Sequence, residues 1–214
     1  MDYKKMVLSI SKEELSKLPT VVYPGDIVVI NTVEEAKAAL DAICRHSVIG
    51  FDTETRPSFK KGHANKVALI QIATDDACYL FRINKFGLID EMIDLFENDA
   101  IVKVGLSLKD DYLVMHKSRQ FQHRNFVDLQ TFVKDYMISD CSLQKIYGII
   151  FNGRISKSQR LSNWEAETLT GPQQMYAAID AWACLKIFTE LLSNSFDADN
   201  SPYLKEVQPE ESKA

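Results

Sequence analysis

The sequence lacks several features that would place a protein in a particular class. No run of about 18 apolar residues occurs, so no transmembrane helix is expected. The first residues carry neither a long apolar stretch nor a small-residue cleavage site, so we expect no secretory leader. The four cysteines lie far apart and form no C-x-x-C pair, which argues against zinc-knuckle and redox motifs. These absences favour a thiol-reducing, cytoplasmic compartment.

The chain also lacks an excess of positive charge, internal repeats and low-complexity tracts. Its formal net charge is −5, whereas a protein that simply coats nucleic acid is basic. Any contact with phosphate would therefore be local or carried by metal ions. What the chain does have is 46% hydrophobic residues, enough for one sizeable core.

The spacing of apolar residues predicts an α/β protein. Two apolar runs, 66–73 and 78–83, flank the turn residues Asp75 and Asp76 and predict a β-hairpin. Helices and strands alternate after it, which favours a mixed sheet flanked by helices. Further strands are expected at 27–30, 48–51, 101–106 and 125–129, and helices at 11–17, 32–44, 88–96, 108–117, 132–137, 143–151 and 173–192.

The chain is expected to have three parts. We expect an N-terminal accessory segment over 1–26 and one domain over 27–193. The remainder, 194–214, is polar and is expected to form a flexible tail.

Two acids follow an apolar run in V-I-G-F-D-T-E-T, residues 48–55. Residues two apart on a strand share a face, so Asp52 and Glu54 would project together. Two such carboxylates repel each other unless a cation lies between them. The alternative is that the strand has ended and both acids are solvated.

Acids occur at two further places. Asp110 and Asp111 fall in the first turn of the helix expected at 108–117, where the helix dipole alone would explain them. Asp180 lies in the middle of a segment that is apolar on nearly all sides, and a buried carboxylate without a partner is costly. Tyr176 shares a helix face with Asp180. A Tyr–Asp pair, or a bond from Asp180 to a distant lysine, is the structural alternative.

Together these acids suggest a metal site. Asp52, Glu54, Asp111 and Asp180 offer only oxygen ligands, which select hard cations such as Mg²⁺ or Mn²⁺. Four carboxylates balance two divalent ions, and two-metal sites commonly serve in-line displacement at phosphorus. Tyr176, with an ordinary pKa of about 10, would position water rather than act as a base.

Three ordered motifs, F-D-T-E-T, S-L-K-D-D-Y-L-V-M and Y-A-A-I-D, resemble those of the 3′–5′ exonucleases of the DEDD superfamily. The resemblance is to the DEDDy branch, whose third motif carries a tyrosine. V-A-L-I-Q, C-Y-L-F, N-F-V-D-L and S-N-W resemble Werner-type exonuclease domains in the same order, and ribonuclease D is more distant. The likeness runs over residues 27–192 and implies a ribonuclease H-like fold. The N-L-K-Y pattern of proofreading domains places the motif II acid at Asp111, whereas counting from the glycine of V-G favours Asp110.

The resemblance also implies roles for the acids. Asp52, Glu54 and Asp180 would hold the ion that activates water, and Asp52 would bridge to a second ion that Asp111 reaches through water. Tyr176 would hydrogen-bond the nucleophile. The implied product is a nucleoside 5′-monophosphate released from a 3′ end, with DNA favoured over RNA. We expect no membrane association, no obligate protein partner and no further domain to grip the substrate.

Two alternatives stay open. One is a nucleic-acid-binding module that has the same fold and no activity. The other is a metal-dependent phosphoesterase that acts on small phosphate esters.

Basic residues flank two of the motifs, three after motif I and three before motif III. These candidate phosphate contacts are Lys60, Lys61, Lys66, Arg154, Lys157 and Arg160. Solvated loops are the alternative for both groups. Trp164 is expected to anchor the motif III helix rather than to stack on a base.

Overall fold

The computed structural model describes residues 6–58 and 65–207. A six-stranded mixed sheet forms its centre, in the order β2-β5-β4-β3-β6-β7. The strands are β2 (Asp26–Ile30), β3 (Val48–Thr55), β4 (Val67–Ala73), β5 (Ala77–Phe81), β6 (Val102–Gly105) and β7 (Phe126–Asp128). The predicted fold class is thus confirmed.

The predicted hairpin is β4 and β5, which pair antiparallel with Ala73 opposite Cys78. Strand β3 lies between β4, to which it is antiparallel, and β6, to which it is parallel. Every residue of β4 is buried, as expected for an apolar strand inside a sheet covered on both faces. β3 continues four residues beyond the predicted end, so both of its acids lie within the strand.

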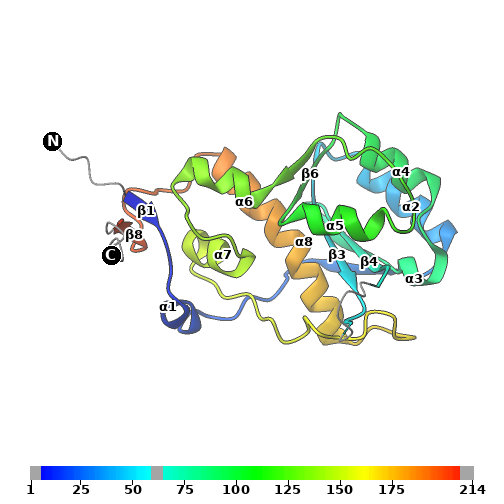
Figure 1. The fold of residues 1–214 in the computed structure, drawn as a ribbon, viewed down its shortest axis with the longest axis horizontal. Coiled ribbons are helices and arrows are strands. Elements are labelled where there is room, and N and C mark those ends of the chain that lie inside the picture. Colours follow the sequence, from blue (N-terminus) through cyan, green and yellow to red (C-terminus); the bar gives the residue numbers. More distant parts are fainter. Residues whose placement is uncertain (1–5, 59–64, 208–214) are drawn as a thin grey trace, which may run out of the picture.

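Helices cover both faces of the sheet (Figure 1). One face packs against α2 (Val33–Ile43), α4 (Asp90–Glu97) and α5 (Leu108–Met115), which supply most of the helical residues in that core. The other face packs against α8 (Gly171–Leu192), with α7 (Leu143–Phe151) and α1 (Lys12–Ser16) beyond it. Short elements complete the helical part: α3 (Ile83–Phe86), α6 (Leu129–Phe132) and the 3₁₀ turn η1 (Val133–Tyr136), where a longer helix was predicted.

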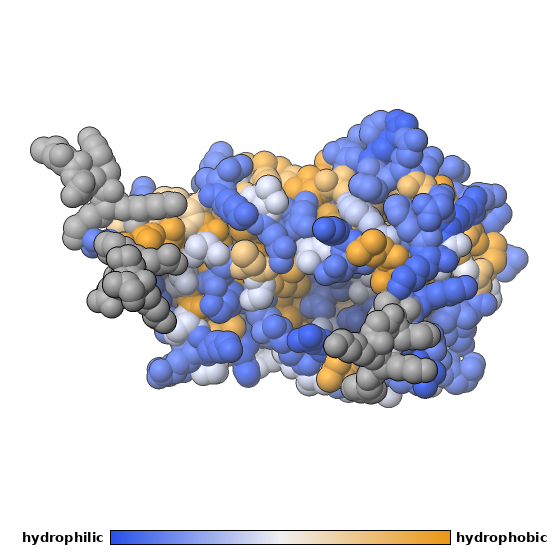
Figure 2. Space-filling model, viewed as in Figure 1, coloured by the Kyte–Doolittle hydropathy of each residue, from blue (hydrophilic) through white to orange (hydrophobic). Residues whose placement is uncertain are grey.

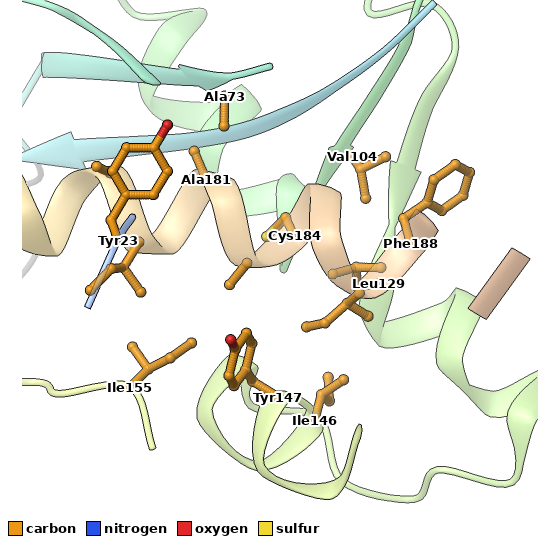
Figure 3. Packing of buried hydrophobic residues seen from close by; sticks show 14 of the residues in the cluster. Tyr23, Ala73, Val104, Leu129, Ile146, Tyr147, Ile155, Ala181, Cys184 and Phe188 are labelled. Carbon is orange, nitrogen blue, oxygen red and sulfur yellow. The ribbon is translucent and has the colours of Figure 1, made fainter. Parts of the chain in front are cut away.

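Helix α8 runs between α7 and the sheet. It approaches β3 so closely that a Cβ atom added to Gly50 would lie 2.0 Å from the carbonyl oxygen of Ala181. Figure 3 shows Tyr147 of α7 on one side of α8, and Ala181 of α8 pointing towards Ala73 of the sheet on the other side. Glycine at position 50 therefore allows α8 to lie directly on the strand that carries the first two acids.

Hydrogen-bonded caps fix where the helices begin. The predicted capping boxes at Ser11 and Thr32 are both present. A third forms at Thr170 with Gln173, and it starts α8 at Gly171, two residues earlier than expected.

The two ends of the described chain meet in a small sheet. β1 (Met6–Leu8) pairs antiparallel with β8 (Leu204–Glu206). Leu8 and Tyr203 are buried in the same core as α8, so the segment before β2 shares the core of the domain. The prediction of a flexible tail from residue 194 is wrong for residues 203–206, because a buried tyrosine and a strand partner hold them. No helix in the described part of the chain is long and apolar enough to cross a membrane.

Candidate active site

Three carboxylates meet where α8 crosses β3. Asp52 and Glu54 project from the same face of β3, as residues two apart on a strand do. Asp180 projects from the middle of α8. One carboxylate oxygen from each of the three acids lies within 4.8 Å of the other two. All three side chains are half-buried. Two elements far apart in sequence thus concentrate negative charge at one point.

A fourth acid joins the cluster from α5. Asp111 is 8% exposed, and the hydroxyl of Thr53 donates a hydrogen bond to its carboxylate. Its charge is the strongest of those that raise the pKa of Asp52. Asp110 is exposed and stands near Ser107 instead. The structure therefore places Asp111, and not its neighbour, beside the other acids.

The carboxylate of Asp128 sets the position of α5. It accepts hydrogen bonds from the backbone N–H groups of Ser107 (3.1 Å) and Leu108 (3.0 Å) at the start of that helix. Ser107 has a left-handed backbone (φ 63°) and makes no cap with its own side chain. Asp128 also caps α6 through Gln130 N–H at 2.9 Å. Asp128 thus caps α6 and also holds the start of the helix that carries Asp111.

Burial and mutual repulsion disturb the titration of the acids. Burial, followed by the charges of Asp111, Asp180 and Glu54, raises the pKa of Asp52 well above its ordinary value. Burial and the charges of Asp180 and Asp111 raise the pKa of Glu54 to about 9, although Arg160 opposes this shift. Without a cation the cluster would therefore retain protons at neutral pH.

The pKa values of Asp180 and Asp111 shift in the same direction, upwards. Burial raises the pKa of each to about 7, opposed at Asp180 by the hydroxyl of Tyr176 and the charge of Lys157, and at Asp111 by Thr53. Burial and the nearby carboxylates also raise the pKa of Tyr176 above its ordinary value. Tyr176 therefore stays protonated at neutral pH and can donate a hydrogen bond, but it cannot act as a base.

These residues fit a divalent cation. The donor atoms are all carboxylate oxygens, which are the ligands preferred by Mg²⁺ and Mn²⁺. Their spacing allows Asp52, Glu54 and Asp180 to share one ion, and Asp111 is close enough to Asp52 for its charge to raise the pKa of that acid. A cation there would relieve the repulsion that raises their pKa values.

A pocket of about 370 Å³ opens over the acids. It lies between β3, α7 and α8, and Figure 2 shows the surface hollowed near the centre of this face. Besides Asp52, Glu54 and Asp180, its lining includes Tyr176, Gln144 and Ser142. Such a concave site with convergent polar groups suits a small part of a larger substrate.

The predicted basic residues are distributed unevenly. Lys157 and Arg160 line this pocket. Arg154 lines an adjoining hollow, and Lys66 lines a separate pocket beside α3. Lys60 and Lys61 lie outside the described residues. The loop before α8 is thus the described source of positive charge at the acids.

Two polar residues near the site were not singled out from the sequence. One is Thr53, which holds Asp111. The other is Gln71, which is fully buried and pairs across the strands with Asp52, and whose amide has no hydrogen-bond partner. Gln71 could have been noticed in the sequence as a polar residue inside the otherwise apolar run of β4. Trp164 is fully buried, as expected of an anchor for α8, and does not offer a face for stacking.

The sequence of this chain is similar to that of known exonucleases. Residues 27–194 match the family model described as 3′-5′ exonuclease. The chain is 29% identical over 184 residues to the bifunctional 3′-5′ exonuclease/ATP-dependent helicase WRN of Mus musculus, covering 81% of this chain and 13% of that protein. The match to this chain covers 13%, 25% and 52% of the length of three curated relatives.

Two solved structures show the same fold. The exonuclease domain of Aedes aegypti Nibbler superimposes with a TM-score of 0.72 at 23% identity, over 84% of this chain and 96% of that one. Escherichia coli RNase D, an exoribonuclease, superimposes with a TM-score of 0.63 at 18% identity, over 78% of this chain and 44% of that one. The predicted ribonuclease H-like fold is therefore confirmed. With the family model matched across most of its length, this chain belongs to the 3′-5′ exonuclease family.

Proposed function

We propose that this protein hydrolyses nucleic acids from the 3′ end with the help of two divalent cations, Mg²⁺ or Mn²⁺. The observation that carries the proposal is the meeting of Asp52, Glu54 and Asp180 within 4.8 Å, with Asp111 alongside. The ions would supply stabilisation of negative charge at the phosphate and a lower pKa for the attacking water.

The residues of the chain would hold and orient the reactants. Asp52, Glu54, Asp111 and Asp180 would bind the ions. Tyr176, protonated because burial raises its pKa, would donate a hydrogen bond that orients the water. Lys157 and Arg160 lie close enough to the acids to oppose the rise in their pKa, so they would also face a phosphate bound there.

DNA is the substrate we favour. The chain is 29% identical to an exonuclease that is joined to a helicase, and 18% identical to the exoribonuclease RNase D. RNA is the competing substrate, and a protein separates the two at the 2′-hydroxyl. Matched single-stranded, duplex and recessed-end substrates of both kinds, compared in Mg²⁺ and Mn²⁺, would decide between them.

The test of the activity is a strand labelled at its 5′ end. Wild-type protein with Mg²⁺ or Mn²⁺ should shorten it one nucleotide at a time and release nucleoside 5′-monophosphates. Asp52→Ala and Asp180→Ala should each lower the rate by about 10²- to 10³-fold, the effect of removing a group that stabilises charge in the transition state. Circular dichroism should show that both variants remain folded.

Two adjacent acids provide a matched control. Asp111→Ala should lower the rate on the same scale, whereas Asp110→Ala should not, because its side chain is exposed and outside the cluster. Near wild-type rates in Asp52→Ala, or internal fragments as first products, would refute the proposal. Hydrolysis of a small phosphate ester without any action on oligonucleotides would favour the phosphoesterase alternative.

A further inference from the structure

A second hollow adjoins the pocket over the acids. It has a volume of about 340 Å³ and is lined by α1 and by the segment that follows α7. Four residues line both the hollow and the pocket: Gln144, Ile155, Ser156 and Lys157. The side-chain amide of Gln144 donates to the carbonyl of Ile155, and this link lies at the junction of the two. A ligand that fills the pocket and extends past this junction would enter the hollow.

The N-terminal segment is fixed next to this junction. Thr20 and Arg154 form a parallel β-bridge, in which Arg154 N–H donates to Pro19 at 2.8 Å and Val21 N–H donates to Arg154 at 3.0 Å. Leu15 of α1 is buried and lies against α7 at Gly148. These contacts hold α1 at a constant position relative to the acids. Figure 1 shows α1 beneath α7, beside the segment that leads on towards α8.

Among the described residues that line it, the hollow has positively charged side chains and no carboxylate. Its lining residues include the cations Lys12, Arg154 and Lys157, and the hydroxyls of Ser16 and Ser156. The two acids of α1 are engaged elsewhere, since Glu13 pairs with Lys17 at 3.0 Å and Glu14 pairs with Lys205 at 3.0 Å. In a chain with a net charge of −5, this makes the hollow locally basic.

We propose that this hollow binds the backbone of the substrate strand on the 5′ side of the nucleotide held over the acids. Lys12, Arg154 and Lys157 contact its phosphates, and the serine hydroxyls donate to phosphate or sugar oxygens. The inference rests on the proposed function. It adds that α1, which lies outside the matched residues 27–194, is part of the substrate-binding surface. The grip is on the backbone, so it is independent of base sequence.

The first test compares strands of different length. Lys12→Ala should raise KM for a single-stranded substrate of about 12 nucleotides about two- to fivefold, the effect of losing one exposed ion pair. It should leave kcat for that strand, and all constants for a dinucleotide, unchanged, because a dinucleotide does not extend past the junction. The matched control is Lys17→Ala, which removes the same charge from the end of the same helix, next to Glu13 and outside the hollow.

A binding measurement separates this proposal from the exonuclease activity. In an Asp52→Ala background, a fluorescent strand of about 12 nucleotides, DNA and RNA in turn, is titrated and followed by anisotropy. Adding Lys12→Ala should weaken binding and reduce the slope of log affinity against log salt by about 0.7. Adding Lys17→Ala should do neither.

The outcomes are distinct. Equal KM values and equal salt slopes for Lys12→Ala and wild type would overturn the hollow as a strand site. Equal losses for the long strand and the dinucleotide would also overturn it, because the effect would then lie at the acids. Binding that depends on Lys12 in a wild-type protein that cleaves no strand would retain the hollow and reject the exonuclease proposal.

Discussion

At the scale of residues, the site is a set of acids that cannot all ionise without a counter-charge. Their raised pKa values mean that the folded protein binds protons more tightly than the unfolded chain, whose acids titrate near pH 4. Between about pH 4 and about pH 9 the folded state therefore holds more protons, and the free energy of unfolding falls as pH rises. A divalent cation would bind the deprotonated acids and reverse this loss.

This leads to a prediction about pH and metal. In chelator, the melting temperature should be lower at about pH 8.5 than at about pH 5.5, apart from the trend of other groups. Mg²⁺ or Mn²⁺ should raise it more at the higher pH, where fewer of the acids hold protons that a cation must displace. Differential scanning calorimetry of wild type and an Asp52→Asn/Asp180→Asn variant would measure both effects. A metal-induced rise that is the same at both pH values, or that persists in the variant, would contradict this account.

Much of the residue-level site could be predicted because the signals are local. Asp52 and Glu54 share a strand face by the period of two, and Asp180 stands out as a charge in an apolar helix. The partners of these acids could not be predicted in the same way. The bond from Thr53 to Asp111 joins β3 to α5, and those from Asp128 reach back to Ser107 and Leu108, so both depend on how distant elements meet.

At the scale of elements, the distance between β3 and α8 decides whether the acids meet. A methyl group at position 50 would collide with backbone rather than with a side chain that can turn aside. We expect Gly50→Ala to lower the free energy of unfolding by about 2 kcal/mol, within the range for overpacked sites. It should also lower turnover, because α8 and Asp180 would shift away from Asp52 and Glu54.

Gly171, the first residue of α8, serves as the control. A Cβ atom at Gly171 would meet nothing within 4 Å, so Gly171→Ala should change the free energy of unfolding by less than about 0.5 kcal/mol. Urea unfolding and initial rates on a labelled strand would measure both variants. If Gly50→Ala had the stability and rate of the wild type, α8 and β3 could accommodate a methyl group at position 50, and the prediction would be wrong.

The elements themselves were largely predictable, and the errors have physical causes. The hairpin and the two N-terminal capping boxes depend on neighbours in sequence, and they are present. β3 is longer than predicted because its polar end still pairs with β4 and the acids face the site rather than water. The helix expected at 132–137 is a 3₁₀ turn that stops at Met137, whose backbone is left-handed (φ 62°).

At the scale of the whole molecule, the segments at both ends of the described chain are part of the fold. Tyr203 is buried, and its hydroxyl donates to the side chain of Asn152 at 2.8 Å, at the end of α7. Its carbonyl accepts from Ser9 N–H at 3.0 Å. These contacts connect α7, the N-terminal segment and the last strand.

We therefore expect Tyr203→Ala to cost about 3 kcal/mol of stability, as for other buried aromatic residues. Tyr203→Phe, which keeps the ring and loses only the hydrogen bond, should cost about 1 kcal/mol. Thermal unfolding of the two variants beside wild type would measure the difference. If Tyr203→Ala has the same melting temperature as the wild type, the contacts of Tyr203 do not stabilise the fold, as the predicted flexible tail would imply.

The pairing of β1 with β8 has a consequence for the way the chain can be rearranged. Because the first and last strands lie side by side, a short linker would turn the domain into a closed ring without stretching any element. The ring could then be opened at another surface turn, such as Asp75–Asp76 between β4 and β5, and still contain every pair in the sheet. The order of the elements along the chain is thus separable from their order in space, and the acids would remain together in the permuted protein.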